Sequence, residues 1–166
     1  MLAEFEKQKV ERETIRRESR LTMIVSLSLL ATIFAYTLIA YLQRGGWQTS
    51  RGVRDAWNVL NIVSIVLIIM VLAVRKTIYF SPRLVREDFS LSALLQRWRV
   101  IDIILLSFAE AIALFGLVIT LLGMPFARTF HFFVSGFLLA MILMPIPWKV
   151  KDKIRNFEKY AGRSVL

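Results

Sequence analysis

Residues 107–120 read SFAEAIALFGLVIT and place one carboxylate, Glu110, inside a long apolar run. The run continues on both sides over 100–122, which is about the 20 residues that a helix needs to cross the hydrocarbon core of a bilayer. It shows none of the period-two alternation that is typical of a barrel strand. The stretch therefore predicts a transmembrane helix with an acid near the middle of the membrane.

Three other runs have the same character, at 21–42, 56–74 and 126–148. Hydrophobic residues make up 57% of the 166-residue chain, above the roughly 45–50% of a soluble domain. Helices satisfy their backbone polar groups internally, which lipid cannot do. We therefore expect an all-α polytopic integral membrane protein, with a four-helix transmembrane domain over 21–148.

The positions of the 22 Lys and Arg residues predict the orientation of the spans. Six precede the first predicted span, six lie between the second and third, and six follow the fourth; of the other four, three lie between the first and second spans and Arg128 lies at the start of the last. Basic residues favour the cytoplasmic side. Both termini are therefore expected in the cytoplasm, and the chain is expected in the inner membrane of a bacterium.

The net charge of +10 has a simple explanation, because the basic residues flank predicted spans. We expect them to contact anionic lipid at the cytoplasmic face. No stacking or base-reading module accompanies them, so nucleic-acid binding is not expected.

Three predicted cytoplasmic segments have helical patterns of their own. Residues 1–20 pair opposite charges at helical spacing, which predicts a charged, solvated N-terminal helix. Leu91, Leu94, Leu95 and Trp98 recur on one face, which predicts a short interfacial helix before the third span. Residues 149–166 predict a second amphipathic helix that lies on the membrane.

The third span carries a stripe of small residues beside Glu110. The stripe recurs at helical spacing and consists of Ala109, Ala113, Gly116 and Thr120. Small residues of this kind allow another helix to approach closely. A charged carboxylate at mid-membrane costs at least about 2.5–3.5 kcal/mol, so it is expected to be protonated, ion-bound or paired. Counting depth along the helices selects Thr32 and Ser28 in the first span as hydroxyls that can serve it. Ser107 precedes Glu110 by three residues on the same helix, and Ser64 or Ser135 could approach from the second and fourth spans.

A second polar group is predicted nearer the outer side of the membrane. It consists of Asn58, Asn61, Arg128 and His131, with Thr120 at a similar level. Such side chains usually join neighbouring helices, at about 0.6 kcal/mol per hydrogen bond. The alternative is a functional cluster separate from Glu110.

The sequence FAEAIALFGLV, residues 108–118, resembles the carboxylate-bearing helix of the c subunit of rotary ATP synthases. In that family a mid-membrane acid followed by small residues binds the transported proton or sodium ion. The resemblance implies that Glu110 is an ion-binding carboxylate, with Ala109, Ala113 and Gly116 as packing positions around it. It covers about residues 100–122 and no other part of the chain.

Enzymatic activity is not expected, because no nucleophile, metal-ligand or phosphate-binding motif occurs. The chain has no cysteine and one histidine, so no cofactor or metal is expected either. Two interpretations remain open. The first is a small non-catalytic subunit or scaffold of a larger membrane complex, formed with other subunits or as a homo-oligomer. The second is a proton- or sodium-coupled protein that uses Glu110.

Overall fold

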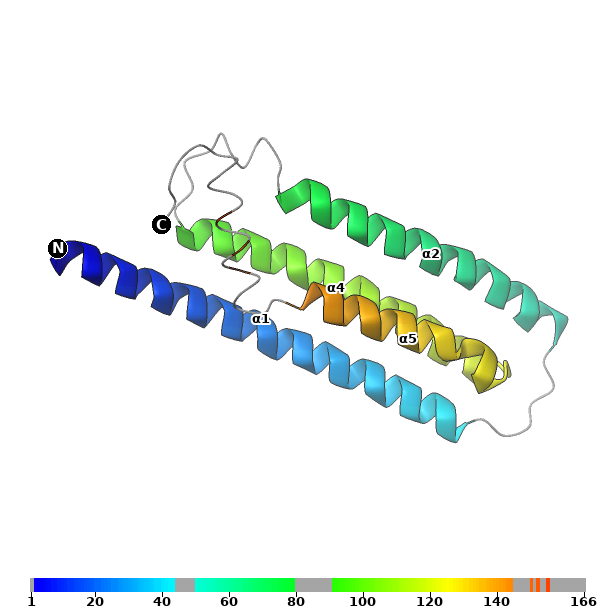
Figure 1. The fold of residues 1–166 in the computed structure, drawn as a ribbon. Helices are drawn as coiled ribbons and strands as arrows, with labels where there is room; N and C mark the ends of the chain where they lie inside the picture. Colours follow the sequence, from blue (N-terminus) through cyan, green and yellow to red (C-terminus); the bar gives the residue numbers. More distant parts are fainter. Residues whose placement is uncertain are drawn as a thin grey trace.

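The computed structural model describes residues 2–43, 50–79 and 91–144, together with residues 150, 152 and 155. In these ranges the chain forms long helices and no strand, which confirms the all-α prediction. The helices run along a common direction (Figure 1). They are α1 (Leu2–Leu42), α2 (Arg51–Tyr79), α4 (Leu91–Leu121) and α5 (Phe126–Leu143).

Each of these helices contains a stretch that is long and apolar enough to cross a membrane. The stretches are Arg20–Leu42, Arg51–Thr77, Ala93–Leu121 and Phe126–Leu143. The outward face of α2 is wholly apolar over several turns, with Val59, Ile62, Ile65, Val66 and Ile69 more than half exposed. Such a surface suits hydrocarbon and not water. The chain is therefore a multi-pass membrane protein.

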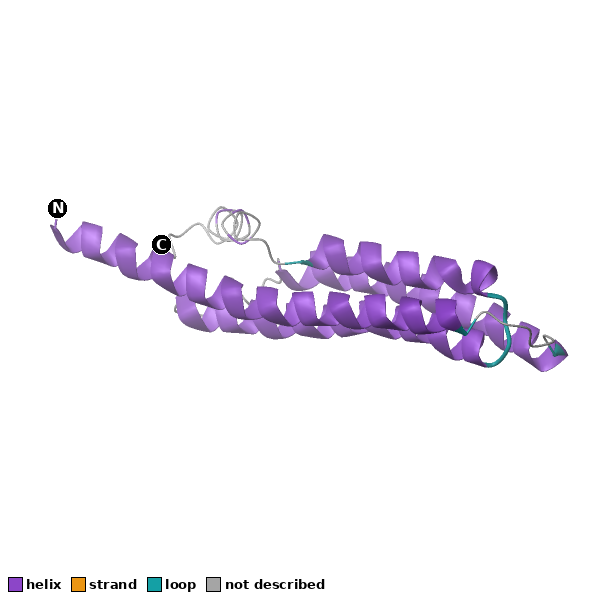
Figure 2. Ribbon diagram, turned by 90° about the horizontal axis from the view of Figure 1, so that it is seen from below, coloured by secondary structure: helices purple, strands orange, loops and turns teal. Residues whose placement is uncertain are grey.

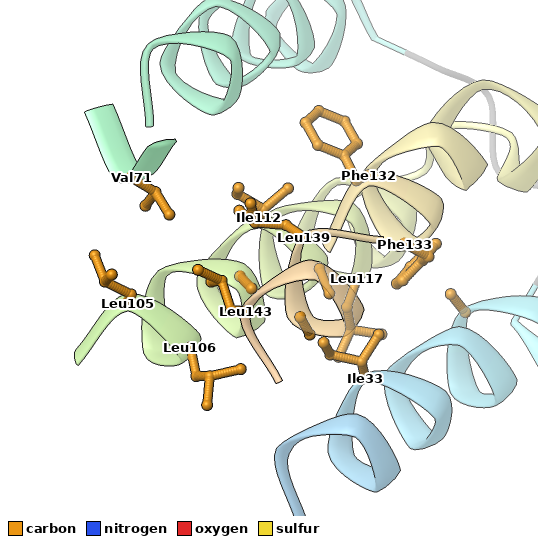
Figure 3. Close-up of a cluster of buried hydrophobic side chains, with 14 residues drawn as sticks. Ile33, Val71, Leu105, Leu106, Ile112, Leu117, Phe132, Phe133, Leu139 and Leu143 are labelled. Atoms are coloured by element: carbon orange, nitrogen blue, oxygen red, sulfur yellow. The ribbon is translucent and has the colours of Figure 1, made fainter. Parts of the chain in front are cut away.

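Helix α4 lies at the centre of the bundle, and α5, α1 and α2 all pack against it. In Figure 1, α1 and α2 lie on opposite sides of the α4–α5 pair. Helices α1 and α4 start at the same end of the bundle and run in parallel. The buried core joins Ile33 of α1 and Val71 of α2 to residues of α4 and α5, as Figure 3 shows.

A tight turn connects α4 to α5 and positions the two helices. Gly123 has a positive φ of 104°, which glycine adopts at little cost. Its N–H donates to the carbonyl of Thr120, and the N–H of Met124 donates to the carbonyl of Ile119. This pair of bonds is a Schellman motif, which satisfies carbonyls at the end of α4.

Helix α5 ends at Leu143, before the end of the predicted span at residue 148. Met144 has φ −53° and ψ 123°, an extended conformation. It precedes Pro145, and the proline ring disfavours a helical conformation in the residue before it. The proline therefore explains where the helix stops.

The predicted interfacial helix near 91–98 is the first part of α4, with no break before the span. Leu94, Leu95 and Trp98 are at most 5% exposed, so this face packs inside the protein instead of lying on lipid. The reason is that these residues continue the same helical face that α4 buries further along.

The charged N-terminal segment is likewise continuous with α1. Figure 2 shows that the helix at the N-terminus projects beyond the other helices of the bundle. The predicted C-terminal helix, 149–166, lies mostly outside the described residues.

Candidate functional site

Glu110 lies half-buried on α4, at the boundary with α1. It precedes the end of α4 at Leu121 by eleven residues, or about 16 Å at 1.5 Å per residue. That distance is close to half of the roughly 30 Å hydrocarbon core. The carboxylate is therefore placed near mid-membrane.

Tyr36 of α1 provides the hydrogen bond to this acid. Its phenol O–H donates to Glu110 Oε1 at 3.3 Å. Helical side chains point back toward the start of their helix, so a long phenol serves a group that lies one turn closer to that start. Sequence reasoning missed Tyr36 because it compared residues by the depth of their backbone and selected Thr32, one turn earlier.

Two of the hydroxyls proposed from sequence make other bonds. Thr32 Oγ1 donates to the carbonyl of Ser28 at 3.1 Å, and Ser107 Oγ donates to the carbonyl of Ile103 at 3.0 Å. Hydroxyls of this kind commonly bond to the carbonyl four residues back in their own helix. Ser28 itself is exposed on α1. None of the three donates to Glu110.

These residues nevertheless share one side of the molecule. Ser28, Thr32 and Tyr36 recur every four residues along α1, and Ser107 precedes Glu110 by three residues on α4, so each set lies on one helical face. We call Ser28, Thr32, Tyr36, Ser107 and Glu110 the α1–α4 seam. Ser28 and Ser107 are exposed, and the other three are half-buried.

The small-residue stripe of α4 faces α5 and not the seam. Ala109 and Ala113 are fully buried. They face Gly136 of α5, where an added Cβ would lie 2.7 Å from the Ala109 carbonyl oxygen and 3.2 Å from Ala113 Cβ. At Gly116 an added Cβ would lie 2.8 Å from Phe132 Cβ. The two helices are therefore in contact at backbone distance.

The last stripe residue, Thr120, joins the same two helices through a buried hydroxyl pair. Its Oγ1 lies 2.7 Å from Thr129 Oγ1 of α5. Thr120 Oγ1 is also 2.7 Å from the Gly116 carbonyl, and Thr129 Oγ1 is 3.1 Å from the Phe126 carbonyl. The two hydroxyl protons can serve two of these three contacts at once. Gly136 and Thr129 were not identified from sequence, although both are small or hydroxylated residues on one face of the last span.

The outer polar residues tie α2 to α5. His131 Nε2 lies 2.5 Å from Asn61 Oδ1, and Trp57 Nε1 donates to the carbonyl of Arg128 at 3.3 Å. Asn61 Nδ2 donates to the Trp57 carbonyl; its oxygen therefore faces His131, and Nε2 is the nitrogen that carries the proton. Arg128 takes part through its backbone, and Asn58 is exposed.

Metal ligands do not gather in the described part of the chain. Among those residues no group of three or more His, Asp or Glu side chains could hold a metal ion. The chemistry available at the seam is instead that of one carboxylate with hydroxyl neighbours.

Comparisons with protein-family models, with curated proteins and with solved structures find no match to this chain. The resemblance of residues 100–122 to the c-subunit helix stays a prediction.

Proposed function

We propose that the protein is a small non-catalytic subunit or scaffold of a larger membrane assembly. The observation that carries this proposal is the α1–α4 seam, where a half-buried acid and exposed hydroxyls occupy an outer face of the bundle. Hydrocarbon cannot hydrogen-bond to these groups, and an ionisable side chain exposed to it is costly. A neighbouring subunit that covers the seam removes that cost.

The native mass of the protein tests this proposal. Membranes with the chain at its natural level are solubilised gently, and the size and composition of the particle are measured by native electrophoresis and mass spectrometry. We expect a particle that contains other polypeptides or several copies of this chain. A single chain in lipid nanodiscs prepared directly from the native membrane would contradict the proposal.

A second candidate function is proton or sodium exchange at Glu110. It is favoured by the Tyr36 hydrogen bond, because a phenol can donate to a carboxylate and can also offer its oxygen to a bound cation. The c-subunit resemblance points in the same direction.

Labelling with dicyclohexylcarbodiimide, which reacts with protonated membrane carboxyls, tests the exchange function. We expect Glu110 to be labelled in native lipid, and sodium or rising pH to protect it. The Glu110→Gln variant is the control for labelling elsewhere. An acid that stays unlabelled at every pH would exclude this function.

We also propose that the end where α1 and α4 begin faces the cytoplasm of a bacterium, against anionic lipid of the inner membrane. Arg16, Arg17, Arg20 and Arg97 are exposed at this end. Because the chain has no cysteine, single cysteines can be placed at Glu13 and at Leu122 without background. An impermeant maleimide should label position 122 in intact cells and position 13 only after permeabilisation.

A further inference from the structure

We infer that the α1–α4 seam binds a transmembrane helix of another subunit that carries a Lys or Arg at the depth of Glu110. This inference rests on the proposed role as a subunit and names the chemistry of the partner. It is based on three features of the seam: an incompletely bonded carboxylate, three hydroxyls that can only accept further hydrogen bonds, and the absence of a nearby cation among the residues that the structure describes.

The Glu110 carboxylate has capacity left after its contact with Tyr36. Within residues 2–43, 50–79 and 91–144, that contact is the one hydrogen bond the carboxylate makes, and it uses Oε1. A carboxylate has about four acceptor positions over its two oxygens. Since Glu110 is half-buried and not fully enclosed by the bundle, the unused positions can bond to a group from a neighbouring subunit.

Three of the seam hydroxyls offer lone pairs and no protons. Thr32 and Ser107 each donate their proton to a carbonyl of their own helix, and Tyr36 donates to Glu110. A hydroxyl that has donated its one proton can still accept. These three hydroxyls therefore present acceptors, which match a Lys or Arg, side chains that donate several hydrogen bonds and accept none.

The chain provides no cation at this depth among the described residues. On α4 itself, Arg99 precedes Glu110 by eleven residues, or about 16 Å along the helix. Arg20 precedes Tyr36 by sixteen residues on α1, or about 24 Å. His131 and Arg128 belong to the tie between α5 and α2.

The positions of the described basic residues also argue against a second copy of this chain as the partner that binds the seam. In a two-fold dimer a surface meets its own equivalent, so the seam would bring a second Glu110 and further acceptors, with no described Lys or Arg at the matching level. Like charges at close range in a low-dielectric medium repel strongly. A different subunit with an embedded cation resolves both the charge and the unused acceptors.

Site-specific photo-crosslinking in native membranes tests the inference. A benzoyl-phenylalanine replaces Ser107, which is exposed on the seam, and in a matched control it replaces Ile69, which is exposed on the far side of α2. The crosslinked polypeptide is identified by mass spectrometry. We expect the probe at position 107 to capture a polypeptide with a Lys or Arg in a span, within about one helical turn of the crosslinked depth, and the probe at 69 not to capture it.

Charge-exchange variants then distinguish an ion pair between Glu110 and the partner's cation from simple proximity of the two helices. Glu110→Gln should lower the crosslink yield at least about tenfold, and Glu110→Lys combined with Glu at the partner's cation should restore it. Capture of a second copy, of a span without a cation, or of a partner insensitive to Glu110→Gln would overturn the inference. A position-107 probe that crosslinks only lipid while the native particle stays large would also overturn it and leave the proposed function standing; a single-chain particle would overturn both.

Discussion

Tyr36 and Glu110 lie 74 residues apart in the chain, yet the phenol of the first donates a hydrogen bond to the carboxylate of the second. The bond crosses the interface between two parallel helices near mid-membrane. It fixes one carboxylate oxygen and leaves the other available at the seam. The pair therefore joins α1 to α4 and orients the acid.

A double-mutant cycle between Tyr36→Phe and Glu110→Gln should give a favourable coupling free energy. Hydrogen bonds between membrane helices average about 0.6 kcal/mol and reach about 1.7 kcal/mol. We expect a value within this range, because the phenylalanine ring keeps the packing and removes only the hydroxyl. The measurement is unfolding of the reconstituted protein by sodium dodecyl sulfate, followed by circular dichroism.

The matched control for this cycle is Thr77→Val, which removes a hydroxyl from an exposed residue of α2 that bonds to its own helix. Its coupling to Glu110→Gln should be zero within error. A Tyr36–Glu110 coupling equally close to zero would mean that the 3.3 Å contact contributes nothing to the stability of the bundle.

Gly136→Ala should destabilise the bundle by about 1–3 kcal/mol, the usual cost of overpacking a filled interface. The new methyl group would lie 2.7 Å from a backbone oxygen of Ala109, and a backbone atom inside a helix cannot move away alone. Unfolding in sodium dodecyl sulfate measures the loss. Gly116→Ala should act in the same direction, since its methyl group would meet Phe132 Cβ at 2.8 Å.

Gly52→Ala is the control for both variants. Nothing lies within 4 Å of its added Cβ, and alanine is favoured over glycine in a helix by up to about 1 kcal/mol. The variant should therefore be neutral or slightly more stable. If Gly136→Ala behaves like Gly52→Ala, the backbone contact between α4 and α5 is looser than the structure describes.

The transmembrane helices could be predicted from sequence because composition and length alone decide whether a helix can cross a bilayer. The stripe of α4 was visible for a similar reason: Ala109 and Ala113 share a face at helical spacing whatever they contact. The residue opposite them, Gly136, could not be assigned, because pairing between helices depends on tertiary packing. The end of α5 at Leu143 depended on a local effect, the constraint that Pro145 places on Met144, which a count of apolar residues does not include.

The site was harder to predict than the fold. Matching Thr32 to Glu110 assumed that side chains extend sideways from the helix, whereas the Tyr36 phenol reaches back along its helix. Trp98 was misassigned for a different reason: an apolar face near a membrane boundary can face lipid or the protein interior with the same sequence pattern. Its 3% exposure places it inside.

The Thr120–Thr129 pair should show coupling in a second cycle, with Thr120→Val and Thr129→Val. Each hydroxyl retains a carbonyl of its own helix when the other is removed, at Gly116 and at Phe126 respectively. The single variants should therefore cost little, with a coupling of about 0.6 kcal/mol from the lost interhelical bond. Unfolding free energies of the four proteins measure it, and a negligible coupling would contradict the 2.7 Å bond between the hydroxyls.

The bond between His131 and Asn61 should determine how firmly the outer end of α2 is attached. Helix α2 packs mainly on α4. Among the described residues, Asn61 and Trp57 make the hydrogen bonds that join α2 to α5. Asn61→Leu removes the acceptor of the His131 proton. We expect this end of α2 to move more freely, with little change in helix content.

Spin labels at Asn58 and Ala127 report this motion, because both positions are exposed and the chain has no cysteine to interfere. Double electron–electron resonance should give a broader distance distribution for Asn61→Leu than for the unsubstituted protein. His131→Gln retains a donor that can reach Asn61 Oδ1, so it should keep the distribution narrow, whereas His131→Phe should broaden it. Equal widths for the glutamine and phenylalanine variants would show that ring packing against Trp57, at 6.1 Å between centroids, and not the hydrogen bond, holds α2 in place.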